Sequence, residues 1–196
     1  MPPSFYDADF RYVDALAPGD RTLVESLKRI QINDCWRFST GGQFWARYMG
    51  EQNSRLTETV NDYTLTRLRQ YGDLAYSDWL RFYGEFLWAD SISPDLPPLP
   101  IDIDRGDIQN LFVDLKLFEY QDHGVYMRGG RQELMYGSQR LVSALDWANT
   151  RRTFEGVKVF RQGEEWDFDA FWMRPVPVSP KDLNSPDENV NLAGGW

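Results

Sequence analysis

Alternation of apolar and polar side chains over unusually long segments is the feature that most constrains this fold. From Trp36 to Met49 one set of alternate positions is mainly aromatic or small, while the other set includes Arg37, Gln43 and Arg47. Successive side chains of a β-strand point to opposite faces of a sheet, so the pattern predicts a strand with one apolar and one polar face. The segment is also longer than the roughly five or six residues of a typical strand.

The same alternation predicts six further strands. They cover residues 64–76, 79–89, 109–117, 125–134, 154–161 and 165–174. The strand expected at 125–134 is less regular, because Arg128 and Arg131 have opposite parity within it. This irregularity indicates a β-bulge or a misplaced strand boundary.

Long and short connections alternate between the predicted strands. The long ones are residues 50–62, 90–108 and 135–153, and the shorter ones are 77–78, 118–124 and 162–164. Long loops at one end and short turns at the other are typical of bacterial outer-membrane barrels. A strand from Phe38 to Tyr48, tilted by about 40°, spans roughly 26 Å, close to the ~25 Å apolar band of such barrels.

We therefore predict an all-β fold, an antiparallel up-and-down transmembrane β-barrel that is incomplete, with about seven strands of a larger barrel. Residues 34–196 form this partial barrel domain. Residues 1–33 are expected to be a short irregular or helical segment on the periplasmic side, with one amphipathic helix between Arg21 and Ile32. The first residues do not resemble a secretory signal, so we expect the gene to start upstream.

Composition excludes several classes of protein. The formal charge is −9 and the 21 Lys and Arg residues are dispersed, which disfavours nucleic acid as a partner. No stretch approaches 18 consecutive apolar residues, so a transmembrane helix is excluded, although a membrane barrel is not. The single Cys35 excludes an internal disulfide.

Candidate chemical motifs are weak. Asp102, Asp104 and Asp107 have a spacing that suits calcium but lack the terminal Glu of an EF-hand, so we expect no metal. The only histidine, His123, has no GxSxG motif to accompany it, and the pair of Asp167 and Asp169 is what any polar strand face provides. We expect no catalytic residue, no cofactor and no enzymatic activity.

A longer pattern carries a family resemblance. The segment GGRQELMYGSQRLVSALDWANTRRTFEGVKVF, residues 129–160, resembles the signature region of the alginate export family of outer-membrane barrels. The segments TRLRQYGDLAYSDWLRFYGEF and EEWDFDAFWMRPV are also similar to strands of that family, so the resemblance extends from Asp34 to the C-terminus. It implies a barrel of about 18 strands whose lumen passes an anionic uronate polysaccharide and carries arginines at its constriction. The chain departs from this in size, so we expect a partial gene.

The polar strand face supplies candidate contacts to an anion. The cations on it are Arg37, Arg47, Arg67, Arg69, Arg81, Lys116 and Arg131, and a loop folding inward would add Arg140, Arg151 and Arg152. The carboxylates on the same face are Asp73, Glu85, Asp114, Glu133, Asp167 and Asp169, so the lining is mixed. Arginine can bind a carboxylate bidentately. Each arginine could equally pair with a neighbouring carboxylate, as we expect for Arg131 and Glu133.

Three functions fit these observations. The first is a passive channel in the bacterial outer membrane, embedded in its lipid, which exports an alginate-like anionic polysaccharide or passes small anionic solutes. The second is a general outer-membrane porin of unknown cargo, because a family fold does not fix the cargo. The third is a soluble carbohydrate-binding β-domain, whose exposed aromatic side chains would stack on sugar rings.

Overall fold

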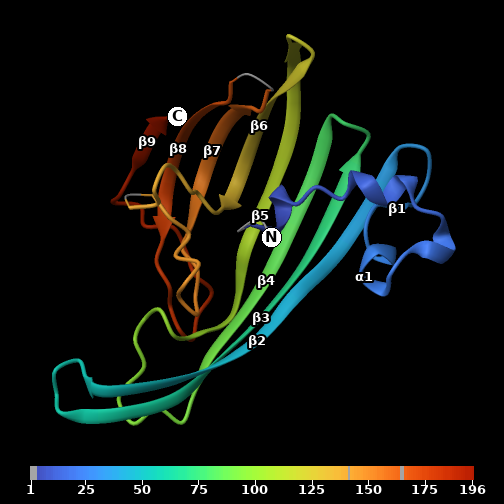
Figure 1. The fold of residues 1–196 in the computed structure, drawn as a ribbon. Coiled ribbons are helices and arrows are strands. Elements are labelled where there is room, and N and C mark those ends of the chain that lie inside the picture. Colours follow the sequence, from blue (N-terminus) through green and yellow to red (C-terminus); the bar gives the residue numbers. More distant parts are fainter. Residues whose placement is uncertain (1–3, 141, 164–165) are drawn as a thin grey trace.

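Every strand belongs to one antiparallel sheet in which each strand pairs with the next along the chain. The computed structural model describes residues 4–140, 142–163 and 166–196, and within them the sheet has nine strands in sequence order. The strands are β1 (Ile30–Gln31), β2 (Trp36–Ser54), β3 (Thr59–Tyr76), β4 (Leu80–Ile92), β5 (Asp104–Tyr120), β6 (His123–Gln132), β7 (Thr153–Arg161), β8 (Phe168–Val176) and β9 (Leu192–Gly195). The sheet curls around a concave face and stays open, with β1 and β9 as its edges (Figure 1).

The predicted strands correspond to β2 through β8, and the all-β antiparallel architecture is confirmed. The prediction of a long connection at residues 50–62 was wrong, because β2 and β3 continue as a paired hairpin and only residues 55–58 separate them. Side chains on this extension also bond across the strands: the Tyr63 hydroxyl donates to Glu51 at 3.0 Å. Glu165, where the last predicted strand begins, lies outside the described residues.

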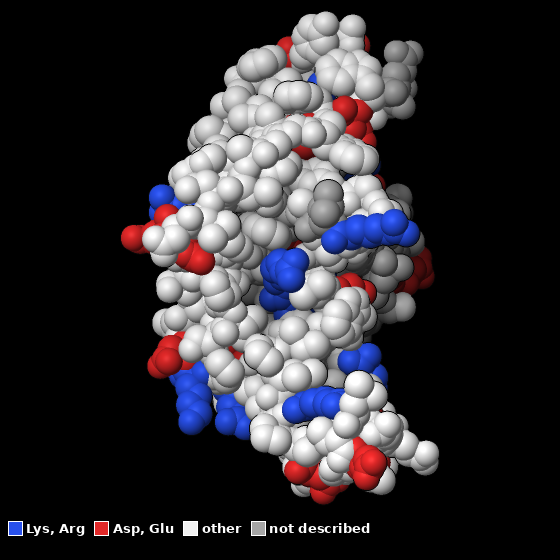
Figure 2. Space-filling model, turned by 90° about the vertical axis from the view of Figure 1, so that its left-hand side faces the viewer, with Lys and Arg blue, Asp and Glu red and all other residues white. Residues whose placement is uncertain are grey.

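The two faces of the sheet differ in chemistry. Strand register places Trp45 opposite Arg67, Gln43 opposite Arg69 and Arg81 opposite Asp114, so the polar positions of β2 to β5 share the concave face. The convex face exposes large apolar side chains. They include Phe44, Tyr48, Leu68, Phe82, Phe86, Trp88, Ile108, Leu111, Val157 and Trp172. Seen from one side, uncharged side chains cover most of the upper surface, while charged ones gather lower down and at the margins (Figure 2).

The N-terminal segment is less helical than its periodicity predicts. The helix expected from Arg21 to Ile32 is wrong beyond one turn, because α1 covers only Leu23–Ser26; a capping box between Thr22 and Glu25 caps its N-terminus. The chain after α1 joins the sheet instead. The carbonyl oxygen of Leu27 accepts a backbone hydrogen bond from β2, and β1 then pairs with β2.

Three short 3₁₀ helices precede α1: η1 (Phe5–Asp7), η2 (Arg11–Ala15) and η3 (Pro18–Asp20). The first of them lies on the concave face, and the chain then runs across to the β1 edge of the sheet (Figure 1). None of the helices among the described residues has the length and apolar character to cross a membrane.

A glycine pair in β6 offers a test of the sheet register. Gly130 has a φ of +125°, and a Cβ built on it would lie 2.3 Å from the carbonyl oxygen of Leu111 on β5. We expect Gly130→Ala to destabilise the fold by about 1 to 3 kcal/mol, because the substitution strains the backbone and forces the two strands apart. Urea unfolding followed by tryptophan fluorescence measures this change.

The neighbouring Gly129 is a matched control, since a Cβ there meets nothing within 4 Å and the residue has no positive φ. Gly129→Ala should leave the unfolding midpoint nearly unchanged. Equal midpoints for the two variants would show that β6 pairs with β5 in a different register.

Candidate functional site: the concave face

Glu133 is the centre of a buried ion-pair cluster on the concave face. Its carboxylate accepts hydrogen bonds from Arg151 Nε at 2.6 Å and Nη2 at 2.8 Å, and both side chains are fully buried. Gln109 donates to the same carboxylate at 3.0 Å and the Ser4 hydroxyl donates at 2.5 Å. The cluster therefore joins the N-terminal segment, β5 and the end of β6 through one acidic side chain.

Electrostatics keeps this carboxyl group ionised. Burial by itself would raise the pKa of Glu133, but the guanidinium groups of Arg151 and Arg69 and the Ser4 hydroxyl lower it below the ordinary glutamate value. Burial likewise disfavours the charged form of Arg151, yet its pairing with Glu133 and Asp146 raises its pKa. A carboxylate in this position is stable only while its cationic partners remain.

Arg69 extends the cluster toward β4. Its Nε donates to Glu85 at 2.5 Å, and the Glu85 carboxylate also accepts from the Tyr83 hydroxyl and from Asn110, each at 3.0 Å. All of these groups are buried. The charge of Arg69 is therefore balanced by protein carboxylates, and Nη2 lies 3.6 Å from Glu133, although this nitrogen makes no hydrogen bond within the described residues.

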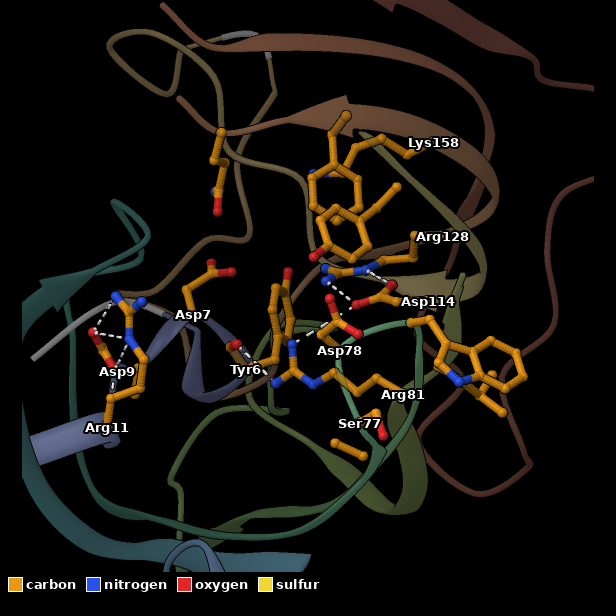
Figure 3. A pocket seen from close by; sticks show the side chains of 17 residues that line it. Tyr6, Asp7, Asp9, Arg11, Ser77, Asp78, Arg81, Asp114, Arg128 and Lys158 are labelled. Carbon is orange, nitrogen blue, oxygen red and sulfur yellow. Dashed lines mark hydrogen bonds and ion pairs between the residues drawn. The ribbon is translucent and has the colours of Figure 1, made fainter. Parts of the chain in front are cut away.

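A second cluster lines a cavity of about 400 Å³ beside η1 (Figure 3). Arg128 makes a bidentate pair with Asp114 at 2.6 and 2.8 Å, and Arg81 makes one with Asp73 at 2.9 and 2.8 Å. Lys158, which also lines the cavity, lies 3.3 Å from its own acidic partner Asp169. The cations facing this cavity are thus balanced by carboxylates.

Aromatic rings run across the strands between the two clusters. Tyr83 stacks on Tyr71 at a centroid distance of 5.7 Å and on Phe112 at 5.1 Å. Phe5 and Tyr6 of η1 complete this buried group. The middle of the concave face therefore combines aromatic packing with paired charges.

Five of the ten predicted contact residues pair with carboxylates of the described chain. Those paired with carboxylates are Arg69, Arg81, Lys116, Arg131 and Arg151. Lys116 lies at the short-turn end and bonds Asp78 at 2.6 Å and Glu119 at 2.5 Å. For these residues the structure contains the carboxylate pairing that the sequence left open as the alternative.

Arg37, Arg47 and Arg67 have no carboxylate partner among the described residues. Arg47 donates to the carbonyl oxygen of Trp147 at 3.0 Å, and Arg67 donates to that of Ala148 at 3.0 Å. Their guanidinium groups lie 4.9 and 4.6 Å from the Trp45 ring, and the buried Nε of each has no hydrogen-bond partner in the described part of the chain. Arg47 is partly exposed, whereas Arg67 is only 5% exposed and also donates to the Gln43 side chain at 3.1 Å, so Arg47 is the more accessible of the two cations.

Arg37 lies farther along the same strand face, at the short-turn end. One of its terminal nitrogens donates to the carbonyl oxygen of Ser77 at 3.1 Å. Its charge, like those of Arg47 and Arg67, is therefore not balanced by a neighbouring carboxylate of the described chain.

In β6, Arg131 faces the opposite way from its prediction. Arg131, expected on the polar face, is in register with the convex residue Leu111, and it pairs with Asp107 and Glu155 rather than with Glu133. Arg128 takes the concave position instead, opposite Asp114. The alternation of the apolar Val125 and Met127 with Tyr126 and Arg128 was the sequence signal for this, because it places Arg128 on the polar face.

The loop from 133 to 152 folds inward in part. It brings Arg151 into the Glu133 cluster, while Arg140 and Arg152 remain exposed. Asn149 anchors the loop, because its side chain donates to the backbone carbonyls of Thr66, Asp90 and Asp102. Of the predicted carboxylates, Asp167 is exposed and accepts a local hydrogen bond from the backbone of Gly163.

The aspartates considered for calcium have protein partners. The side-chain amide of Asn184 donates to Asp104 at 2.8 Å and to Asp107 at 2.7 Å, while Asp102 accepts from the backbone of Leu99. No group of three or more His, Cys, Asp or Glu residues that could hold a metal ion occurs in the described ranges.

Removing the charge of Glu133 should be strongly destabilising. Glu133→Gln keeps the shape of the side chain but leaves the buried Arg151 without its main counter-charge, for which we expect a loss of about 3 to 5 kcal/mol in unfolding free energy. Urea unfolding checks this value. The control is Glu119→Gln, which breaks an exposed pair with Lys116 and should not move the midpoint.

The same carboxylate should make stability depend on pH. Because its pKa is lower in the folded protein than in the unfolded chain, its contribution is complete above the ordinary value of about 4.3 and is lost as the pH falls through the folded value. Urea midpoints measured downward from pH 6 should therefore fall more steeply for the wild type than for Glu133→Gln. Parallel pH profiles would contradict an ionised Glu133.

Comparison with known proteins agrees with the sequence resemblance. No curated protein matches the chain, and no solved structure matches it. The family model described as alginate export matches residues 37–196, which is most of the chain and includes β3 through β9 and all of β2 except its first residue. The chain therefore belongs to the alginate export family.

Proposed function

We propose that this chain forms part of a passive channel in the bacterial outer membrane, which exports an alginate-like anionic polysaccharide or passes anionic solutes. Family membership supports an outer-membrane export role at the level of the family. We further propose that the protein carries out no covalent chemistry and needs no cofactor, since transport along a lined conduit requires neither.

The observation that carries this proposal is the difference between the two sheet faces. Long strands expose apolar side chains such as Phe44 and Phe86 on the convex face and gather charged and aromatic groups on the concave face. An apolar convex face suits the hydrocarbon of a bilayer, and a polar concave face suits a water-filled lumen. A soluble carbohydrate-binding domain would bury one of these faces against a second layer, and the described chain has a single sheet.

Arg47 and Arg67, with Trp45 between them, form the proposed contact for a uronate residue. The guanidinium groups offer donors to a carboxylate, and the indole ring offers an apolar surface for the sugar. The carbonyl groups of Trp147 and Ala148 hold the arginines in place without neutralising them. A site of this kind binds an acidic sugar weakly enough to release it again.

A general porin remains the second candidate. The pairing of Arg69, Arg81 and Arg151 with carboxylates favours it, because a face whose charges are balanced selects poorly between solutes. Block of the channel current by uronate oligomers distinguishes this candidate from the first, since a general porin would not prefer them to neutral oligosaccharides of the same length.

The test is conductance of the full-length protein in a planar lipid bilayer. We expect uronate oligomers to block the current of the wild type, and the double variant Arg47→Gln/Arg67→Gln to weaken the block roughly tenfold because two charge-assisted contacts are lost. Lys116→Gln removes a cation that already has two acidic partners, so it should leave the block unchanged. Equal block in all three proteins would remove Arg47 and Arg67 from the pathway.

A further inference from the structure

We propose that residues 4–10 form an internal plug, which occupies the concave face and narrows the conduit until it is displaced. This inference rests on the proposed channel function. The segment places Ser4, Phe5 and Tyr6 in buried positions against the middle of the sheet, where a solute would otherwise pass. Figure 1 shows the N-terminal end of the chain on the concave side, and Figure 3 shows Tyr6 among residues of β4, β5 and β6.

Aromatic and cationic groups hold the plug by its side chains. The ring of Phe5 lies 5.3 Å from that of Tyr71, with the guanidinium of Arg69 4.2 Å from its centroid. Tyr6 packs edge-on against Tyr83 at 5.5 Å and Phe112 at 5.1 Å. These contacts fill the space between the two charged clusters.

Glu133 retains the plug through two hydrogen bonds, and we call it the latch. Its carboxylate accepts from the Ser4 hydroxyl at 2.5 Å, and its backbone carbonyl accepts from the Tyr6 hydroxyl at 2.9 Å. On the other side Arg81 donates to the carbonyl oxygen of Tyr6 at 2.9 Å. Three hydrogen bonds therefore fix Ser4 and Tyr6 on the concave face of the sheet.

The plug is separable from the sheet that holds it. Its backbone hydrogen bonds are local, from Asp7 to Ser4 and from Ala8 to Phe5, and within the described ranges no backbone–backbone hydrogen bond joins residues 4–10 to a strand. Removing the segment would leave the ladder between the strands complete. A β-strand of the sheet could not leave in this way, because its departure would leave the backbone hydrogen-bonding groups of the neighbouring strands unpaired.

The latch also connects the plug with the loop from 133 to 152. The Glu133 carboxylate that binds Ser4 is held by Arg151 of that loop, and the backbone of the loop holds Arg47 and Arg67 through Trp147 and Ala148. The Glu133 cluster therefore joins the plug to the loop that holds the proposed cargo contact.

The test uses Ser4→Ala/Tyr6→Phe, which removes both latch hydroxyls and keeps the aromatic ring. The control Ser26→Ala/Tyr12→Phe removes the same atoms from exposed positions of the N-terminal segment. Two readouts are taken on the full-length protein: hydrogen exchange of the amides of residues 5–10 in detergent, and conductance in a planar bilayer. We expect the latch variant to exchange roughly tenfold faster and to conduct more than the wild type, and the control to match the wild type.

The outcomes separate the plug from the channel. Faster exchange with unchanged conductance would show that the segment docks without narrowing the conduit, which overturns the plug. Wild-type exchange as fast as that of an unstructured peptide would overturn the docking itself. Absence of conductance in every protein, with the exchange difference intact, would overturn the proposed channel and the plug with it, while the docked arrangement would stand.

Discussion

The buried pair of Glu133 and Arg151 is the interaction on which the rest of the concave face depends. A carboxylate with no exposed surface is tolerated only when cations and hydrogen-bond donors replace the water that it has lost. Here the replacements come from distant parts of the chain: Ser4 at the N-terminus, Gln109 on β5 and Arg151 in the following loop. Satisfying one charge therefore fixes three segments in relation to one another.

Sheet geometry explains why such pairs can form at all. In an antiparallel meander the polar positions of neighbouring strands lie opposite each other, as Arg81 does to Asp114 and Asp114 to Arg128. Side chains in these positions are close enough for ion pairs and stacked rings. The convex face follows the same alternation with apolar residues, so one periodic pattern creates both an apolar surface and a charged interior surface.

This pattern is also what made much of the fold predictable. The strands and the facing of Arg67, Arg81 and Asp114 follow from local alternation, which depends only on the period of a β-strand. The facing of Arg131 was not predicted, because its parity conflicts with that of Arg128 and the two glycines between them carry no side chain that would mark a face. The docking of Phe5 and Tyr6 left no periodic trace, and the partner of each arginine depends on register and on loops far away in sequence.

The balance of charge along the concave face has a consequence for movement. Because Arg69, Arg81 and Arg128 each face a carboxylate of the protein, a polyanion in the proposed channel would meet alternating attraction and repulsion at short range and no deep electrostatic well. Salt screens buried pairs such as Arg69 and Glu85 much less than exposed ones, so this balance depends little on ionic strength. On such a surface, the carboxylates of a polymer in the proposed channel would exchange one weak contact for the next, so no single contact would retain the polymer.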